Sequence, residues 1–434
     1  MAAEPREAAA AIWRAAVAAG DVGPLVRRHL RVEGATLTAG PLRRDLAGAG
    51  RLIVLGAGKA GAAMAAATEA ILGDRVAHGF VVVKDGYRLP TTRIEIAEAG
   101  HPVPDDRGLA ASHRLLALAA AATRDDLVVF LVSGGGSALT PAPVPPVTLA
   151  EKQALTRSLL GAGATIDELN AVRKHLSRLK GGLLARAAAP ATVLTLALSD
   201  VIGDPLDVIA SGPTAPDPTT YADALEVLRR RRVLDRTPRS IVERLRAGAA
   251  GAVAETPKPG DPIFEGVTSL VVGNNALVVE AAAAEAERLG YRPHVLTRAL
   301  QGEARDVARD LVERARALPA ASALIAGGET TVTVRGSGRG GRCQELALAA
   351  SLTLKADEPL VVLAAGTDGT DGPTDAAGGL VDATTAARGK AAGADPARAL
   401  ADNDAHAFLT AAGACLVSGP TNTNLLDLYL VLRP

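Results

Sequence analysis

The sequence has little cysteine, few aromatic side chains and no excess of charge of either sign. Its 434 residues include two cysteines, Cys343 and Cys415, and aromatic residues make up only 2%. Two isolated cysteines exclude a disulfide framework and a cysteine-based metal site. Lys and Arg together number 47, as do Asp and Glu, so no net charge attracts nucleic acid or an anionic membrane. We therefore expect neither nucleic acid nor a membrane as a partner.

The sequence also lacks an apolar run long enough to cross a bilayer, which takes about 20 residues. The N-terminal stretch carries Glu4, Glu7 and Arg14, which favours an amphipathic helix over a signal peptide. The expected location is the cytoplasm, and the expected oligomeric state is a monomer or a homodimer.

Strand-like and helix-like runs alternate along the chain, which favours an α/β protein with a mainly parallel sheet. The strand-like runs are "RLIVL", "GFVVVK", "RIEIAE", "DDLVVFLVS" and "ATVLTLALS" in the first half, and "TSLVVG", "RPHVLT", "SALIAGG", "TTVTV" and "LVVLAAG" in the second. A stretch rich in Gly, Ala and Pro, 248–264, predicts a domain junction. We expect a Rossmann-like N-terminal domain over 1–247 and a C-terminal α/β domain over 265–434.

Glycine and polar residues concentrate where loops leave the predicted strands, the edge at which open α/β sheets bind ligands. These stretches are "GAGKAG" at 56, "SGGGSA" at 133, "SDVIGDPLDVIASGPT" at 199, "GGET" at 327, "GSGRGGRCQE" at 336 and "GTDGTDGPTD" at 366. A basic helix-like segment, "LNAVRKHLSRLKGG", begins at residue 169.

The first stretch has the G-x-G-x-x-G spacing of a dinucleotide-binding turn, after a strand and before a helix. The NAD version needs an acidic residue after the second strand, and Asp85 stands there. Lys59 inside the turn favours instead an anion near the helix N-terminus. A tight turn that binds no ligand is the third interpretation.

Three consecutive glycines in "SGGGSA" allow backbone N–H groups to converge on an anion, although a simple glycine-rich bend has the same composition. The basic segment has two interpretations of equal weight. Asn170 and Arg173 lie one turn apart and share a helix face, but basic residues on a helix are usually solvated.

Aspartates follow two of the predicted strands: Asp200 and Asp204 in one loop, Asp368 and Asp371 in another. Carboxylates suit Mg²⁺, and aspartate is equally common in turns that bind no metal. Arginines on the glycine-rich loop at 336 suit phosphate or carboxylate oxygens. Phosphoryl transfer requires these parts, since its catalysis is mostly positioning and charge stabilisation.

The motifs "GAGKAG", "SGGGSAL", "ELNAVRKHLSRLKGG", "SDVIGDPLDVIASGPT", "GGETTVTV", "GRGGRCQE" and "GTDGTDGPTDAAGG" resemble, in this order, those of the glycerate 2-kinases of the GckA/TtuD type, the MOFRL/DUF4147 family. The resemblance covers nearly the whole chain. It implies two three-layer α/β/α domains with the active site in a cleft between them. It also implies transfer of the γ-phosphate of ATP to the 2-hydroxyl of D-glycerate with Mg²⁺ or Mn²⁺.

The resemblance assigns the family's functional lysine to Lys59 and its functional arginine to the "GRGGR" loop, where Arg342 is favoured over Arg339. With the residue patterns it gives four sets of candidates. The catalytic set is Lys59, Arg342, Asp200 and Asp371. The substrate-binding set is Arg339, Arg342, Asn170, Arg173 and Lys180. The nucleotide-binding set is Gly56, Gly58, Gly134, Gly135, Gly136, Ser137, Ser211 and Gly212. The metal-binding set is Asp204 and Asp368, with Mg²⁺ held mainly through ATP.

Two other functions fit parts of the pattern. Members of the family have also been called hydroxypyruvate reductases, and such an enzyme needs an acid–base histidine paired with a carboxylate. His101 and His175 are the only suggestive histidines. A sugar-acid-binding protein without catalysis would keep the arginines and would not need the aspartates. The kinase accounts for the most motifs.

Overall fold

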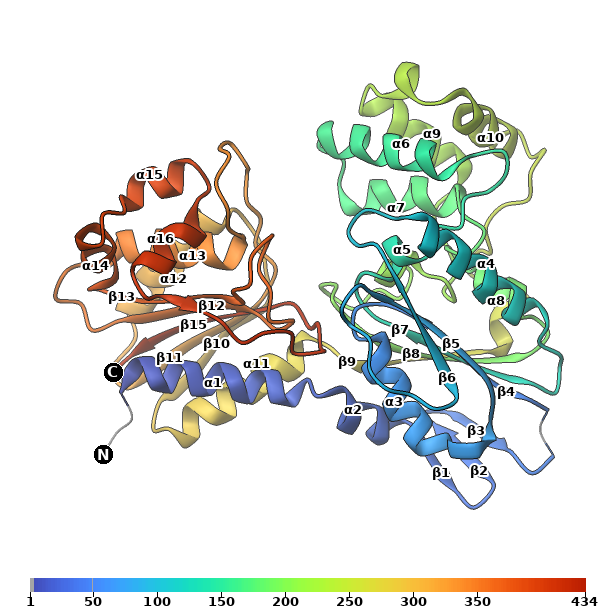
Figure 1. The fold of residues 1–434 in the computed structure, drawn as a ribbon, viewed down its shortest axis with the longest axis horizontal. Coiled ribbons are helices and arrows are strands. Elements are labelled where there is room, and N and C mark those ends of the chain that lie inside the picture. The colour runs from blue at the N-terminus through green and yellow to red at the C-terminus, as the bar shows by residue number, and fades with distance from the viewer. Residues whose placement is uncertain (1–3, 49) are drawn as a thin grey trace. The chain divides into compact units, whose positions relative to one another are not determined.

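The computed structural model describes residues 4–48 and 50–434, which form two compact units (Figure 1). The N-terminal unit comprises Val22–Ser199 and Asp204–Val272, and the C-terminal unit comprises Gly273–Pro434, the segment up to Asp21 and Asp200–Gly203. This division falls later than the predicted junction at 248–264, because the run that follows the junction joins the first sheet as a strand.

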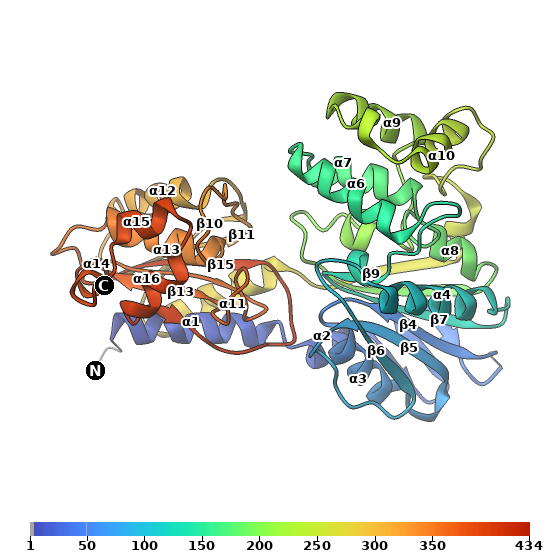
Figure 2. The same cartoon turned by 45° about the horizontal axis from the view of Figure 1, so that its top comes forward.

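The N-terminal unit is built on a six-stranded sheet of order β6-β5-β4-β7-β8-β9. The five strands from β6 to β8 in this order pair in parallel. Every residue of β4 and β7 is buried, as expected of a parallel sheet covered on both faces. Helix α3 lies on one face and α4 with α8 on the other (Figure 2). The bounds are β4 Leu52–Ala57, β5 Val76–Lys84, β6 Ile94–Ala99, β7 Leu127–Val132, β8 Thr192–Leu198, β9 Val267–Gly273, α3 Gly61–Leu72, α4 Asp106–Ala120 and α8 Leu183–Ala188.

Four further helices of this unit form a lobe with its own apolar core, which includes Leu155, Leu169 and Leu228. Helices α6 and α7 each begin at a threonine whose side chain and N3 glutamate form a capping box, so their start points are fixed locally. These two helices carry the basic residues discussed below. The bounds are α6 Leu149–Gly161, α7 Ile166–His175, α9 Tyr221–Arg230 and α10 Arg239–Ala249. The remaining elements are α2 Val22–His29, β1 Arg31–Glu33, β2 Thr36–Ala39, β3 Leu42–Asp45 and α5 Gly136–Leu139.

The C-terminal unit is an α/β/α sandwich around a mixed sheet of order β10-β11-β15-β12-β13-β14. Only β10 and β11 pair in parallel, and β15 runs antiparallel to both its neighbours, β11 and β12. Helices α1 and α11 cover one face, and α12 and α13 cover the other (Figure 1). The bounds are α1 Pro5–Ala19, α11 Asn275–Arg288, α12 Ala304–Arg316, α13 Arg342–Thr353, α14 Thr385–Ala391, α15 Pro396–Ala401, α16 Ala405–Ala411, β10 Arg292–Leu300, β11 Ser322–Gly328, β12 Val361–Gly366, β13 Gly378–Asp382, β14 Cys415–Leu416 and β15 Asp427–Arg433.

One stretch of the described chain, Pro5–His29, passes a length and composition test for a membrane span. Its first part is helix α1, in which Ala9, Ile12 and Ala16 are fully buried. Helix α1 packs against α11 and β12. A helix that covers a sheet in this way has its apolar side in the protein core, which accounts for its composition.

The strands of the second half differ from the prediction at three runs, and the short strands β13 and β14 were also not expected. The run "TSLVVG" forms most of β9 and belongs to the first sheet. The run "TTVTV" forms only an isolated bridge, Glu303 to Thr331, and its Val334 is 73% exposed. The C-terminal run "DLYLVLR" was not expected as a strand, yet it forms β15 near the middle of the second sheet.

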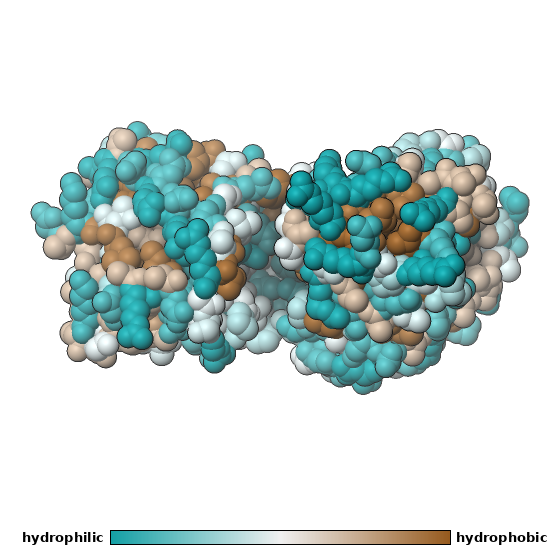
Figure 3. Space-filling model, turned by 90° about the horizontal axis from the view of Figure 1, so that it is seen from above, coloured by the Kyte–Doolittle hydropathy of each residue, from teal (hydrophilic) through white to brown (hydrophobic). Residues whose placement is uncertain are grey.

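Exposed apolar surface is limited. On the face shown in Figure 3, hydrophobic side chains occur in small groups between hydrophilic ones. In the N-terminal unit, the large apolar side chains that are more than half exposed are Val103, Leu160 and Ile166.

Candidate functional site

The lysine turn and the triple-glycine loop lie together at one edge of the first sheet. They follow β4 and β7, which are parallel neighbours, so both loops leave the same edge. The Lys59 amide donates to the Gly134 carbonyl at 2.8 Å. A Cβ on Gly58, whose φ is +143°, would lie 2.1 Å from the Ser133 hydroxyl oxygen. A Cβ on Gly135 would lie 3.3 Å from Lys59 Cγ. The backbone of one loop therefore holds the lysine beside the other.

The glycine spacing of the first motif has a packing explanation that requires no dinucleotide. A Cβ on Gly56 would meet the Leu131 carbonyl oxygen at 2.6 Å, so the glycine is needed inside the sheet. Asp85, the candidate ribose ligand, accepts two N–H bonds from Arg107, at 2.7 and 2.8 Å. A cofactor ribose would have to displace this exposed ion pair, which weakens the case for an NAD site.

Three predicted residues from distant parts of the sequence form a chain of hydrogen bonds. The Ser211 hydroxyl donates to Asn170 Oδ1 at 2.8 Å, and its oxygen is 2.9 Å from the Ser137 hydroxyl oxygen. Asn170 is 4% exposed, and its Nδ2 has no partner among the described residues. Next to this chain, Gly212 has φ +62°, and a Cβ there would lie 2.8 Å from Asp207 Cα.

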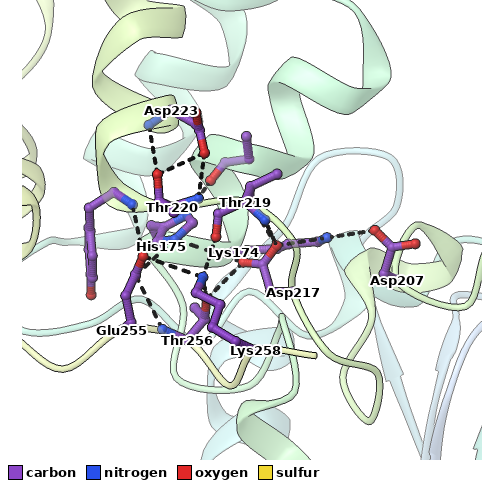
Figure 4. A network of polar contacts seen from close by, with 12 residues as sticks. Lys174, His175, Asp207, Asp217, Thr219, Thr220, Asp223, Glu255, Thr256 and Lys258 are labelled. Atoms are coloured by element: carbon purple, nitrogen blue, oxygen red, sulfur yellow. Dashed lines mark hydrogen bonds and ion pairs between the residues drawn. The ribbon is translucent and has the colours of Figure 1, made fainter. Parts of the chain in front are cut away.

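The basic segment 169–182 divides into two groups with different surroundings. The first group, Lys174 and His175, is neutralised by carboxylates (Figure 4). Lys174 Nζ lies 3.1 Å from Asp207 Oδ2 and 3.2 Å from Asp217 Oδ1. His175 Nδ1 lies 2.6 Å from the Ala171 carbonyl oxygen, and its Nε2 lies 3.2 Å from Glu255 Oε1. Burial lowers the pKa of the His175 imidazole. Both side chains are enclosed by their own unit, and His175, 1% exposed, offers no position for a substrate.

The second group, Arg173 and Lys180, lines a cavity of about 290 Å³ together with Lys152 of α6. Lys180 is 2% exposed, and its Nζ donates to the Thr140 carbonyl at 2.7 Å. Lys152 Nζ donates to the Pro141 carbonyl at 2.8 Å. In residues 4–48 and 50–434, no carboxylate pairs with any of the three side chains. Burial, and next the Arg173 charge, lower the pKa of Lys152 to about 7. Burial with Lys152 and Arg173 also lowers the pKa of Lys180 well below its usual value.

The C-terminal unit places Arg342, the arginine predicted to be functional, at the edge where three strands meet. Gly328 of β11 and Gly366 of β12 both stand opposite Asp427, the first residue of β15. Arg342, the first residue of α13, donates to Asp427 from Nε at 2.5 Å and from Nη2 at 3.0 Å. Its Nη1 lies 2.7 Å from Glu329 Oε1. Burial alone would lower the pKa of the Arg342 guanidinium, but the Asp427 carboxylate raises it overall.

The two aspartates of the loop at 366 have different surroundings. Asp371 is 4% exposed, and it accepts from the Cys343 amide at 3.2 Å and the Gln344 amide at 2.8 Å. It therefore holds the N-terminus of α13, next to Arg342. Burial raises the pKa of the Asp371 carboxyl to about 6, although the Gln344 amide opposes this. Asp368 stands beside Asp427, because a Cβ on Gly366 would lie 3.3 Å from one carboxylate and 3.4 Å from the other.

The remaining predicted residues are placed as follows. Arg339 is exposed, and its Nη2 donates to the Pro373 carbonyl at 2.8 Å. Asp200 belongs to the C-terminal unit, where its Oδ2 accepts from the Asn424 amide at 3.1 Å. Asp204, at φ +56°, belongs to the N-terminal unit. Across the described residues, no group of three or more His, Cys, Asp or Glu side chains is placed to hold a metal ion.

The chain matches known families over most of its length. Residues 8–246 match a domain of unknown function, DUF4147, and residues 322–427 match the MOFRL family. A protein of Thermotoga maritima named D-glycerate 2-kinase is 44% identical over 390 residues, which cover 88% of this chain and 90% of the relative. The chain belongs to the DUF4147/MOFRL family of glycerate 2-kinases.

Two further similarities bear on the function. A crystal structure of a Thermotoga maritima glycerate kinase superposes with a TM-score of 0.83 at 40% identity, covering 99% of each chain. An Agrobacterium vitis protein named putative hydroxypyruvate reductase is 43% identical, with 88% of this chain and 87% of that protein covered. The family thus includes both names, and the geometry around Gly56 and Asp85 favours the kinase.

Sequence reasoning missed three charged residues of these sites: Lys152, Glu329 and Asp427. Lys152 lies in an ordinary polar stretch of an amphipathic helix, so nothing distinguishes it in the sequence. Glu329 lies within the motif "GGET", where nothing in the sequence distinguishes it as a partner of an arginine. Asp427 has a signal in the sequence, because a lone carboxylate opens the apolar run "LYLVL". An acidic residue at the first position of a buried strand marks a sheet edge where polar groups gather.

Proposed function

We propose that this chain transfers the γ-phosphate of ATP to the 2-hydroxyl of D-glycerate. The observation that carries the proposal is the 44% identity to a D-glycerate 2-kinase across both units of the chain. The local geometry agrees with it. A lysine lies beside a glycine-rich loop in the N-terminal unit, and an arginine bound by carboxylates lies at a sheet edge in the C-terminal unit.

Each group has a defined part in the proposed reaction. Lys59 neutralises charge on the transferring phosphate, and the backbone N–H groups of the 134–137 loop bind nucleotide phosphate oxygens. Arg342, held by Asp427, has two guanidinium N–H groups beyond those given to carboxylates, and these bind the carboxylate of glycerate. Asp371 acts through Arg342 by fixing the start of α13, and Asp368 stays a candidate ligand for the cation. Such positioning and charge stabilisation is what phosphoryl transfer requires.

ATP implies a divalent cation, and we propose Mg²⁺ or Mn²⁺. The described residues do not form a protein cage for it. Mg²⁺ in kinases is commonly held by substrate phosphates and one or two carboxylates, so we assign its binding mainly to ATP. No step of the reaction is derived through the cation. We further propose that the protein works in the cytoplasm.

The reductase is the second candidate, because a 43% identical relative carries that name. The test is to supply the purified chain with ATP, Mg²⁺ and D-glycerate, and separately with NADH and hydroxypyruvate. We expect ADP release in the first assay and a stable NADH signal in the second. NADH consumption without ADP formation would overturn the kinase assignment. The position of the phosphate on the product, measured by NMR, separates transfer to the 2-hydroxyl from transfer to the 3-hydroxyl.

A further inference from the structure

Lys152, Arg173 and Lys180 line a cavity bounded by the 102–104 segment, α5, α6 and α7, with the exposed Arg157 as a fourth cation, and the described chain supplies no carboxylate partner for them. Buried lysine and arginine are almost always paired, since an unpaired buried charge is costly. The basic segment 169–182 offers an internal comparison. Lys174 is as buried as Lys180, each 2% exposed, but Lys174 meets two carboxylates and Lys180 meets one neutral carbonyl. The cavity is therefore prepared for an anion.

The charge of the cavity indicates what kind of anion it takes. Burial is the main cause of the lowered pKa values of Lys152 and Lys180, and the neighbouring Arg173 charge lowers both further. When both lysines are protonated, these three side chains carry three positive charges, of which a single carboxylate neutralises one and a diphosphate or triphosphate neutralises all. Charge-assisted bonds to phosphate are among the strongest that lysine and arginine make.

The rim of the cavity has the opposite chemistry. Val103 and Leu160 line it and are 59% and 55% exposed, so they mark where the cavity reaches the surface. Leu149 and the prolines 102, 104 and 141 add further apolar lining. Glycerate has hardly any apolar surface to bury there. A purine ring has such a surface. In a nucleotide, the ribose separates this ring from the anionic phosphate chain, so the two ends can contact the apolar rim and the cations at the same time.

The cavity also reaches the triple-glycine loop, next to the lysine turn. Ser137 lines the cavity and follows Gly135, beside which Lys59 lies. An anionic chain that enters past Leu160 and reaches Ser137 would bring its last phosphate to the loop that holds Lys59. This is the direction that transfer of a terminal phosphate requires.

We propose that this cavity is the nucleotide site, with the base against Val103 and Leu160 and the phosphate chain on Lys152, Arg173 and Lys180. The proposal rests on the proposed kinase function and sharpens it. It moves Arg173 and Lys180 from the acid substrate to the nucleotide, and it adds Lys152, which carries no sequence motif.

Calorimetric titration of the full chain tests the proposal, with ADP, inorganic pyrophosphate and D-glycerate as separate probes. The variants are Lys152→Gln and Lys180→Met, with the exposed Lys390→Gln as the matched control. Losing one charge-assisted contact should raise the Kd values of ADP and pyrophosphate by roughly tenfold or more. Glycerate affinity should not change, and the control should bind all three probes like the wild type. Circular dichroism confirms that each variant is folded.

A third variant separates the base from the phosphates. Leu160→Ser should raise the Kd of ADP about threefold and leave the Kd of pyrophosphate unchanged. Equal ADP affinity in wild type, Lys152→Gln and Lys180→Met would overturn the proposal. So would a loss of glycerate binding with ADP binding retained, because the cavity would then hold the acid. These titrations contain no second substrate, so a failure to phosphorylate glycerate would refute the function and leave the nucleotide site standing.

Discussion

Asp427 binds Arg342 through two parallel hydrogen bonds, from Nε at 2.5 Å and from Nη2 at 3.0 Å. Asp427 is 1% exposed and also accepts from the Tyr429 hydroxyl at 2.9 Å. A planar guanidinium held at two points has one orientation. The direction in which Arg342 offers its remaining N–H groups is therefore set by a residue 85 positions later in the chain.

The first prediction concerns this pair. Asp427→Asn keeps the shape of the side chain and removes its charge, so Arg342 loses its strongest partner. We expect kcat/KM to fall roughly 10- to 100-fold and stability to fall by roughly 2 kcal/mol. Glu329→Gln is the matched control, because Glu329 contacts the same guanidinium from a more exposed position. Its stability should stay within about 1 kcal/mol of wild type. Equal effects of both variants on stability would contradict the role given to Asp427.

The second prediction concerns Lys59 and Arg342 as groups that contact the substrates. Lys59→Ala should lower kcat/KM by roughly 10²-fold, because one charge in a preorganised site is lost. Arg342→Lys should not rescue activity, since an ammonium cannot make the bidentate contact with Asp427. Thermal unfolding should show that both variants are folded. Near wild-type turnover in Lys59→Ala would remove it from the reaction.

The third prediction is a pH dependence of stability that arises at Asp371. Its folded pKa of about 6 is above the unfolded value of about 3.9. The folded protein therefore binds the proton more tightly, and this contribution is complete below pH 3.9 and is lost as pH rises through 6. In Asp371→Asn this contribution is absent. The difference in unfolding free energy between wild type and variant, measured in urea at several pH values, should change across pH 4–6. If the difference in unfolding free energy does not change with pH, the pKa of Asp371 is the same in the folded and unfolded protein.

The fourth prediction concerns the cost of the cation cluster in the absence of ligand. The pKa of Lys152 is about 7 in the folded protein, and about 10.4 when unfolded. The unfolded chain binds the proton more tightly, so this site makes stability rise with pH between about 7 and 10.4. Lys152→Met should raise the melting temperature at pH 7 by about 2–4 °C. In this variant the stability should also rise less steeply between about pH 7 and pH 10 than in the wild type. A lower melting temperature would mean that Lys152 stabilises the fold.

The fifth prediction concerns the metal. We expect activity to require Mg²⁺ or Mn²⁺ and to return fully when either is added back after dialysis against a chelator. Because the described residues form no three-ligand cluster, the dialysed protein should hold far less than one metal per chain by elemental analysis. A stoichiometric metal that survives the chelator would show a dedicated protein site.

Local patterns in the sequence predicted the α/β class, most strands of the first sheet and the motif loops correctly. Buried parallel strands such as "LVVFLV" are continuous apolar runs, and they are recognisable without knowing their neighbours. The run "TTVTV" has the same local preference, and it failed as a strand because no neighbouring strand offers it a full ladder. The C-terminal strand β15 was missed because its strand partners are distant in the sequence. It lies between β11 and β12, whose residues stand about 100 and 60 positions earlier.

The same distinction holds for the sites. The sequence by itself determined which residue types stand on the loops: Lys59 in a glycine turn, Arg342 on a glycine-rich loop and the aspartates after two strands. Only the tertiary structure decided which charges are neutralised and which are left unpaired. Lys174 and Lys180 are two lysines of one basic segment, yet only the fold brings Asp207 and Asp217 to the first and Lys152 to the second. The sign of a side chain's charge follows from the residue type alone. Whether that charge is neutralised depends on the groups that the folded chain brings within a few ångströms of it.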